Sequence, residues 1–241
     1  MKTFFCFAYV ALSMIFLAPF GMVAMLFSVI GFRNSMTAVL RLIAQGWARS
    51  AIRTIGCKVT VSGKENVPRK GGLCFVSNHG SIFDILILLA YSGRTIGFIA
   101  KKELAVIPIL NLWIFLLGGL FIDRKNPRKA LKTINKGIEK IKAGGSMLIF
   151  PEGSRSRGKG LLPFHPGSLK LATQAGALIV PVALAGTYEI FEKYGRATAS
   201  PVKIIFCKPV ETANLPATDK KQILADQMHG IIKEALENNE Q

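Results

Sequence analysis

Short apolar runs alternate with segments of helical periodicity from residue 58 to residue 207, and this alternation constrains the fold most. Strands are predicted at 58–63, 73–77, 95–100, 120–122, 147–150, 177–184 and 202–207. Helices are predicted between them at 85–91, at 108–117, from Asn126-Pro127 to Gly144, and at 166–176. This order predicts an α/β domain with a central, mostly parallel sheet flanked by helices. A last amphipathic helix is expected after a cap at Thr218-Asp219.

Residues 3–32 carry no charged side chain. The run is long enough to cross a bilayer as one helix, but Pro19 and Gly21 interrupt it, so a bent or re-entrant hairpin is the alternative. It is too long for the apolar part of a typical signal peptide. Four arginines then alternate with apolar residues and predict a basic amphipathic helix on anionic headgroups: Arg33, Arg41, Arg49 and Arg53. We therefore expect an N-terminal membrane-associated helical segment at 1–54 and an α/β domain at 55–241.

A second uncharged run covers residues 104–122. It barely reaches the length of a membrane-spanning helix, and Pro108, Asn111 and the pair Gly118-Gly119 interrupt it. We favour a helix followed by a strand over a second span.

The chain is basic and apolar, with a formal charge of +17 and 50% hydrophobic residues. Such a charge predicts an anionic partner, and the hydropathy favours a lipid membrane over nucleic acid. The four cysteines show no metal-ligand or disulfide spacing, so neither a metal site nor a disulfide framework is indicated: Cys6, Cys57, Cys74 and Cys207. Reduced cysteines and arginines after the apolar run favour a cytoplasm-facing location.

Three polar stretches follow predicted buried strands, at 78–84, 123–124 and 151–157. Because ligands bind beyond the carboxyl ends of strands in α/β sheets, we expect the three to face one cleft. In the first, His79 can take a proton from a hydroxyl near neutral pH, and Asp84 can orient its ring. The alternative is a helix-capping aspartate beside a hydrogen-bonded core histidine.

The other two stretches offer Arg124, Arg155 and Arg157, whose guanidinium groups match phosphate. Gly153 and Ser154 leave room for a close approach, and Glu152 could orient an arginine or hold a substrate hydroxyl. The alternative is a solvated basic loop held by Glu152. No serine-hydrolase elbow, P-loop, zinc-protease or dinucleotide motif is present in the sequence. A base without a protein nucleophile beside it indicates that a substrate hydroxyl is the nucleophile.

These residues resemble the bacterial 1-acylglycerol-3-phosphate acyltransferases, within the wider glycerolipid acyltransferase group. Four motifs occur in the family's order and spacing over roughly residues 55–210: Asn78-His79 with Asp84, Gly118-Gly119-Leu120-Phe121-Ile122-Asp123-Arg124, Phe150-Pro151-Glu152-Gly153-Ser154-Arg155-Ser156, and Ile179-Val180-Pro181-Val182-Ala183. The segment Lys101-Lys102-Glu103-Leu104 is also similar. Two positions depart from the family pattern, namely Ser154 for threonine and His165 for lysine.

The resemblance implies that His79, oriented by Asp84, deprotonates the 2-hydroxyl of lysophosphatidic acid. The alkoxide would attack an acyl thioester, either acyl-CoA or acyl-carrier protein, and give phosphatidic acid. It also implies that the phosphate is held by Arg124, Glu152, Gly153, Ser154 and Arg155, with support from Asn78, Lys101, Gly118 and Pro181. No metal or organic cofactor is implied, and the expected location is the cytoplasmic face of a bacterial inner membrane. Two alternatives remain open: another lysophospholipid or aminolipid acceptor, and a non-catalytic lipid-binding protein.

Overall fold

An eight-stranded sheet forms the centre of the protein. The computed structural model describes residues 1–212 and 220–238. The strands are β1 Lys58–Ser62, β2 Leu73–Ser77, β3 Ile96–Lys101, β4 Leu120–Ile122, β5 Ser146–Ile149, β6 Leu178–Ala185, β7 Pro201–Phe206 and β8 Val210–Glu211. Their order is β1-β7-β6-β2-β5-β3-β4, and β8 pairs with β6. Only the pairs of β6 with β7 and with β8 are antiparallel among the described strands, which confirms the predicted α/β class and mostly parallel sheet.

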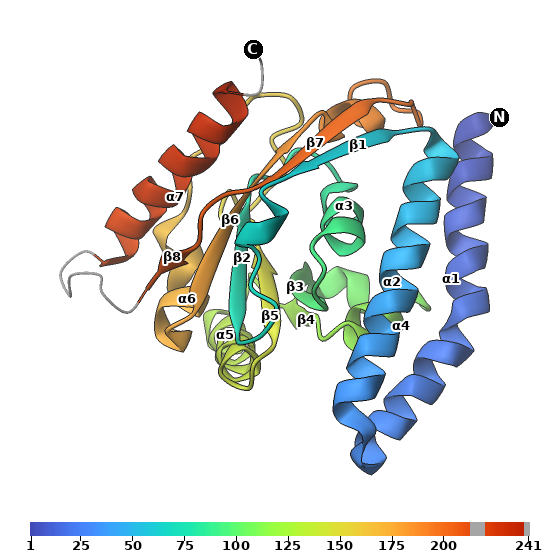
Figure 1. Cartoon of the computed structure of the whole chain (residues 1–241), viewed down its shortest axis with the longest axis horizontal. Coiled ribbons are helices and arrows are strands. Elements are labelled where there is room, and N and C mark those ends of the chain that lie inside the picture. Colours follow the sequence, from blue (N-terminus) through green and yellow to red (C-terminus); the bar gives the residue numbers. More distant parts are fainter. Residues whose placement is uncertain (213–219, 239–241) are drawn as a thin grey trace.

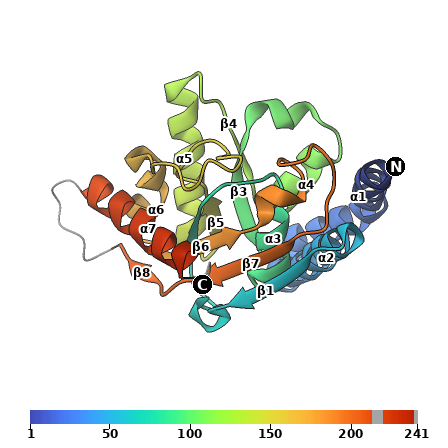
Figure 2. The same ribbon diagram turned by 90° about the horizontal axis from the view of Figure 1, so that it is seen from above.

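Helices cover both faces of this sheet. They are α1 Lys2–Phe27, α2 Arg33–Ile55, α3 Asp84–Tyr91, α4 Leu110–Leu116, α5 Pro127–Lys142, α6 Lys170–Ala175 and α7 Lys220–Glu237. Figures 1 and 2 show α1 to α4 on one side of the sheet and α5 to α7 on the other. Each side has its own apolar core, and successive residues of β2 alternate between the two. Phe75 packs with α3 residues, whereas Cys74 and Val76 pack with residues of α6 and α7.

The sequence signals at α5 are confirmed by its structure. The side chain of Asn126 accepts a hydrogen bond from the backbone N–H of Lys129, and Pro127 occupies the first turn. Ile138 and Ile141 are buried against the sheet. The helix therefore begins where the cap predicts, and it carries the chain back from the carboxyl end of β4.

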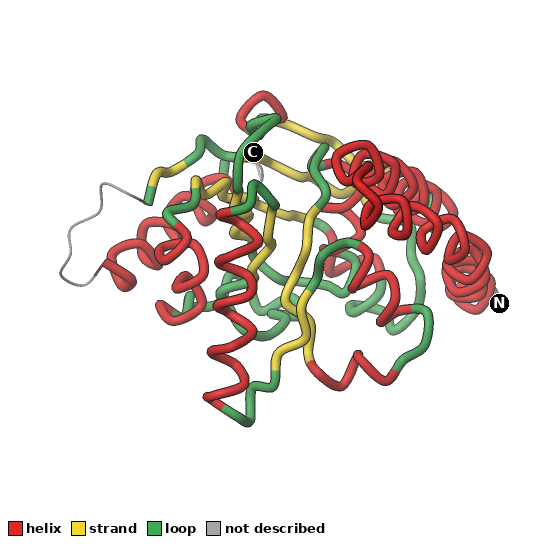
Figure 3. Tube along the Cα trace, turned by 90° about the horizontal axis from the view of Figure 1, so that it is seen from below, coloured by secondary structure: helices red, strands yellow, loops and turns green. Residues whose placement is uncertain are grey.

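The N-terminal apolar run folds differently from its predicted division. Helix α1 continues through Pro19, so the expected interruption there is wrong. Gly21 instead lets α4 approach closely, because a Cβ atom at this position would lie 2.7 Å from Leu116 Cδ1. The chain reverses at Ser28–Phe32, a short π-helical segment, and α1 and α2 run side by side as a helical hairpin (Figure 3).

One helix among the described residues, Lys2–Ile30, is long and apolar enough to cross a membrane. Most of its large apolar side chains are exposed, among them Phe4, Leu12, Phe16 and Leu26. Figure 1 shows the turn of the hairpin reaching beyond the sheet. An exposed apolar surface of this kind fits association with a membrane. The run at 104–122 forms α4 and β4, so the alternative of a second spanning helix is wrong.

Helix α2 belongs to the core of the α/β domain. Ala48 and Ile52 are buried in the same core as α3. Arg41 Nη1 donates to the carbonyl of Gly93, just beyond the end of α3, and Arg49 Nε donates to the carbonyl of Ala90 in its last turn. These two arginines thus bond to the protein through one nitrogen each, and the placement of α2 on anionic headgroups stays a prediction.

Three other predictions can be placed in this fold. The division of the chain at residue 54 stays a prediction, although one core extends across it. In α7, Leu224 and Met228 are buried as expected, whereas Ile223 is exposed. The predicted cap at Thr218-Asp219 lies outside the described residues.

Candidate active site

His79 lies in the turn that joins the end of β2 to the start of α3. Its Nδ1 is 2.8 Å from Oδ2 of Asp84, which is fully buried at the first residue of α3. The same oxygen accepts a hydrogen bond of 2.9 Å from the backbone N–H of Ser81. Because a carboxylate only accepts, this contact assigns the hydrogen of a neutral imidazole to Nδ1 and leaves Nε2 as the acceptor. Asp84 thus bonds to the backbone of the turn, as the alternative of a structural aspartate expects. It also orients the His79 ring, as a general base requires.

The loop after β5 binds both the backbone N–H and the backbone carbonyl of His79. The backbone N–H of His79 donates to Glu152 Oε1 at 2.6 Å, and its carbonyl accepts from the N–H of Ser156 at 2.7 Å. The ring stacks on Phe150, with centroids 4.0 Å apart and 14° between the planes. These contacts leave the imidazole little freedom to turn.

Arg124, directly beyond β4, reaches the same loop. Its Nη1 donates to the carbonyl of Gly153 at 2.6 Å. Gly153 has φ +69°, and a Cβ atom there would also lie 3.3 Å from His165 Cδ2, so glycine suits this position. Ser154 and His165 are exposed on this loop region. The structure therefore brings together the three polar stretches that follow separate strands, as predicted, while the cleft between them stays a prediction.

Glu152 is buried beneath this arrangement, with 3% of its surface exposed. Its second oxygen accepts a hydrogen bond of 3.3 Å from the backbone N–H of Leu162. Burial raises the pKa of Glu152 to about 7, while the N–H groups of His79 and Leu162 oppose the rise. Its carboxylate joins two backbone segments, so the prediction that Glu152 orients an arginine is wrong.

The family model described as Acyltransferase matches residues 58–185, which contain all four motifs of this site. The chain belongs to this acyltransferase family. It is 32% identical over 197 residues to the 1-acyl-sn-glycerol-3-phosphate acyltransferase BAT2, chloroplastic, of Brassica napus. That alignment covers 80% of this chain and 55% of the relative. It is 36% identical over 138 residues to the 1-acyl-sn-glycerol-3-phosphate acyltransferase of Borreliella burgdorferi, in an alignment that covers 57% of this chain and 55% of the relative. The chain thus spans about half the length of these relatives.

A solved acyltransferase structure has the same fold over its whole length. The crystal structure of the 1-acyl-sn-glycerophosphate (LPA) acyltransferase PlsC from Thermotoga maritima matches with a TM-score of 0.81 and 27% identity. The match covers 100% of this chain and 98% of that one. It confirms the family resemblance and extends it to the N-terminal helices.

Asn78 and Pro181, expected as supporting residues of the acyltransferase site, join β2 to β6. The side chain of Asn78 accepts from the N–H of Leu184 at 2.8 Å and donates to its carbonyl at 2.9 Å. Pro181 pairs in register with Val76, and its carbonyl accepts from the N–H of Cys207. Both residues hold the end of β2 against β6.

Lys101 lies at the carboxyl end of β3, at the edge of the sheet that carries the site, whereas Gly118 precedes the opposite, amino end of β4. Lys101 is exposed at the last position of β3, and the neighbouring Lys102 makes a 2.8 Å ion pair with Asp123, next to Arg124. Gly118, with φ +80°, accepts a hydrogen bond from Lys140 Nζ at the turn between α4 and β4. The family motif therefore uses Gly118 for the turn that leads into β4.

Sequence reasoning missed the residue that holds Arg155. Glu192 Oε1 accepts from Arg155 Nη1 at 2.9 Å, and the Glu192 side chain is 7% exposed. Glu192 lies in the loop after β6, beyond the region that the family model matches. Because β6 runs parallel beside β2, its carboxyl end meets the same edge of the sheet. The predicted strand at 177–184 was the available signal for this fourth loop.

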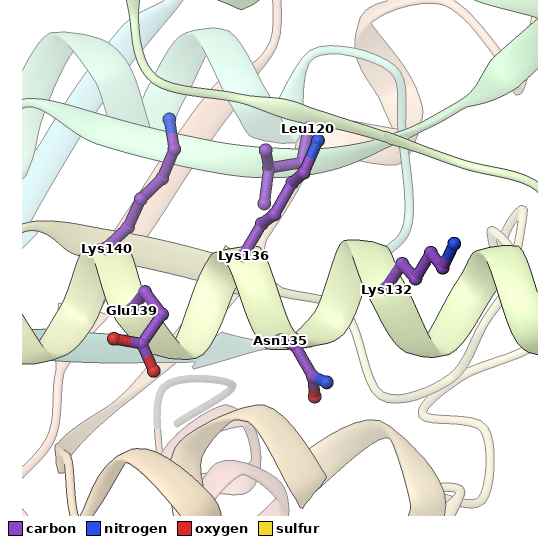
Figure 4. Close-up of a pocket in the computed structure, with 6 residues that line it drawn as sticks. All are labelled: Leu120, Lys132, Asn135, Lys136, Glu139 and Lys140. Carbon is purple, nitrogen blue, oxygen red and sulfur yellow. The ribbon is translucent and has the colours of Figure 1, made fainter.

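A shallow groove of about 490 Å³ runs along α5, away from these residues. Figure 4 shows Lys136 and Lys140 on the same side of α5 as Leu120, with Asn135 and Glu139 on the other side. None of the predicted site residues lines this groove. The candidate site is therefore the edge of the sheet that carries His79, where the His79–Asp84 pair, Arg124 and Arg155 meet.

Proposed function

We propose that this acyltransferase transfers a fatty acyl group from a thioester to the 2-hydroxyl of 1-acyl-glycerol-3-phosphate, which yields phosphatidic acid. The observation that carries the proposal is the His79–Asp84 pair at the sheet edge shared by Arg124 and Arg155. The pair supplies a base, and the arginines supply charges for an acceptor phosphate. The names of the relatives and of the solved structure support the same acceptor.

In the proposed reaction, Nε2 of His79 takes the proton of the acceptor hydroxyl. The oxygen attacks the thioester carbonyl, a C–O bond forms, and the C–S bond breaks. The proton passes from His79 to the departing thiolate, so the base is restored. Asp84 stabilises the imidazolium in between, and Phe150 keeps the ring in its plane. A positioned general base typically contributes about 10²–10⁴-fold.

The side chains near His79 favour direct transfer over an acyl-enzyme. Cys74, in β2, is fully buried in the sheet. Ser81 is buried, and its hydroxyl bonds to Glu192. Neither residue presents a free nucleophile to the base. The substrate hydroxyl is therefore the nucleophile that we propose.

Both the acyl donor and the absence of a cofactor stay predictions. Acyl-CoA and acyl-carrier protein offer the same thioester to His79. The proposed steps need no metal or organic cofactor, because the base and the arginines supply proton transfer and charge. Assays with each donor, in the presence and absence of a chelator, measure both points.

We also propose that the hairpin of α1 and α2 holds the enzyme at a membrane, where the acyl tail of the acceptor resides. The exposed apolar side chains of α1 support this location, with Phe16 71% exposed. We place the active site on the cytoplasmic face of a bacterial inner membrane. The four free cysteines are compatible with that reducing compartment.

The test compares the wild type with His79→Ala, using lysophosphatidic acid and both thioester donors. We expect activity to fall by at least about a hundredfold, with unchanged vesicle binding and melting temperature. His229→Ala is the matched control, because His229 lies on α7 against Phe164. Activity retained in His79→Ala would remove the proposed base. A wild type that transfers acyl groups only to unphosphorylated acceptors would support the aminolipid alternative, and one that binds vesicles without turnover would support the non-catalytic one.

A further inference from the structure

The carboxylate of Glu192 joins the turn that carries the base to the arginine of the phosphate loop. Oε2 accepts from the hydroxyl of Ser81 at 2.6 Å. Oε1 accepts from the backbone N–H of Ile82 at 2.8 Å and from Arg155 Nη1 at 2.9 Å. The Glu192 side chain is 7% exposed and that of Arg155 is 30% exposed, so the carboxylate itself is largely removed from water while its arginine partner reaches the surface.

On the side of the base, two carboxylates hold consecutive peptide groups. Ser81 N–H donates to Asp84, and Ile82 N–H donates to Glu192. The peptide groups between His79 and Asp84 are thus held from both sides. Without Glu192, the hydroxyl of Ser81 and the N–H of Ile82 would lose this partner, and the turn would gain freedom to move. Because general-base catalysis depends on near-attack geometry, a small shift of Asp84 reduces the rate.

On the side of the proposed phosphate site, Glu192 binds one nitrogen of the Arg155 guanidinium group. A guanidinium has five N–H donors in a rigid plane, and the pair with Glu192 uses Nη1 of Arg155. A charged partner at one nitrogen orients the plane and leaves the remaining donors for phosphate oxygens. An arginine that is oriented before the ligand arrives loses less entropy on binding.

We propose that Glu192 is a positioning residue that couples the catalytic base to phosphate recognition. It holds the Ser81–Ile82 turn for the His79–Asp84 pair and orients Arg155 for the phosphate of the acceptor. The proposal deepens the proposed function and rests on it. It assigns no role to Glu192 in binding the thioester donor.

The test is Glu192→Gln in the full chain, assayed with lysophosphatidic acid and acyl-CoA. We expect kcat to fall about tenfold and KM for lysophosphatidic acid to rise about tenfold, with an unchanged KM for acyl-CoA. Glu189→Gln is the matched control, because Glu189 lies in the same loop but pairs with Lys193 and is 41% exposed. It should match the wild type within about twofold.

Two double-mutant cycles separate positioning from a general structural role. Arg155→Gln should raise KM in the wild type but add little in Glu192→Gln, since Glu192 acts on the phosphate through Arg155. Ser81→Ala should lower kcat alone but add little in Glu192→Gln. If Glu192→Gln fails to fold, Glu192→Asp, which keeps the charge but is one methylene shorter, takes its place in both cycles.

Additive effects in both cycles would overturn the proposal, as would kinetics of Glu192→Gln equal to those of Glu189→Gln. An equal loss for donor and acceptor that follows the melting temperature would also overturn it, because that result reports a destabilised fold. An inactive wild type would instead refute the proposed function. The two failures are therefore distinguishable.

Discussion

Replacing Asp84 by asparagine is expected to lower kcat about a thousandfold. Asp84 is fully buried, and its Oδ2 lies 2.8 Å from Nδ1 of His79. When His79 takes the proton, the new cation and the carboxylate attract each other by about 4 kcal/mol, for charge centres about 4 Å apart at an effective dielectric constant of about 20. Each factor of ten in rate corresponds to about 1.4 kcal/mol, so the loss is about three powers of ten.

The fold of Asp84→Asn should survive, because asparagine has the same shape. Its carbonyl oxygen can still accept from Ser81 N–H. Its amide nitrogen would replace Oδ1, which is buried and finds no hydrogen-bond partner among the described residues. An unpaired buried donor costs about 1–3 kcal/mol, so the melting temperature should fall by several degrees.

The assay follows release of free thiol with saturating acyl-CoA and varied lysophosphatidic acid. KM for lysophosphatidic acid should stay near the wild-type value, because Asp84 contacts the ring and the turn only. Asp226→Asn is the matched control, since Asp226 lies exposed on α7 and bonds to Gln222. A folded Asp84→Asn enzyme that keeps more than about a tenth of the wild-type kcat would refute the role of Asp84.

Four further predictions concern binding, pH, membrane attachment and the core. Arg124→Gln should raise KM for lysophosphatidic acid about ten- to hundredfold with little change in kcat, measured in the same assay. The pKa of Glu152 is about 7 in the folded protein and 4.5 ordinarily. Protonation of Glu152 therefore stabilises the fold by about 3 kcal/mol below pH 4.5, and this stabilisation is lost as the pH rises through 7. The melting temperature of Glu152→Gln, measured against pH, should lack this decrease. Phe16→Asp should weaken vesicle flotation without changing the melting temperature, because Phe16 is exposed. Removal of residues 1–54 should abolish folding, seen by circular dichroism, because it deletes Ala48 and Ile52 from the core.

The strands and their loops were predictable because burial leaves a local pattern. The strand β2 occupies the predicted residues 73–77, and β4 the predicted 120–122. Asn126-Pro127 marks the start of α5 through a cap that acts within three residues. The polar stretches after these strands then follow from the geometry of parallel sheets, in which carboxyl ends share an edge.

The pairing of individual side chains was not predictable in the same way. Glu192 and Ser81 are 111 residues apart, and no periodicity relates them. Glu152 occurs beside two arginines in the sequence, yet its carboxylate bonds to backbone N–H groups of His79 and Leu162. The turn at residues 28–32 was also missed, since proline and glycine earlier in the run are stronger local signals than the packing that decides the reversal.

Helix α2 packs against both α1 and α3, and so connects the proposed membrane anchor to the helix that carries Asp84 of the proposed base. Helix α3 begins at Asp84, and the carbonyls at and beyond its other end bond to Arg41 and Arg49 of α2. Cations suit the C-terminal end of a helix, so these bonds stabilise α3 as well as attach it. Because α2 also packs against α1, an unbroken series of contacts joins the apolar surface to Asp84. Under the proposed membrane attachment, these contacts would connect the hairpin to the proposed His79–Asp84 pair, so that a lipid acceptor could bring its hydroxyl to His79 while its acyl tail stays in the membrane.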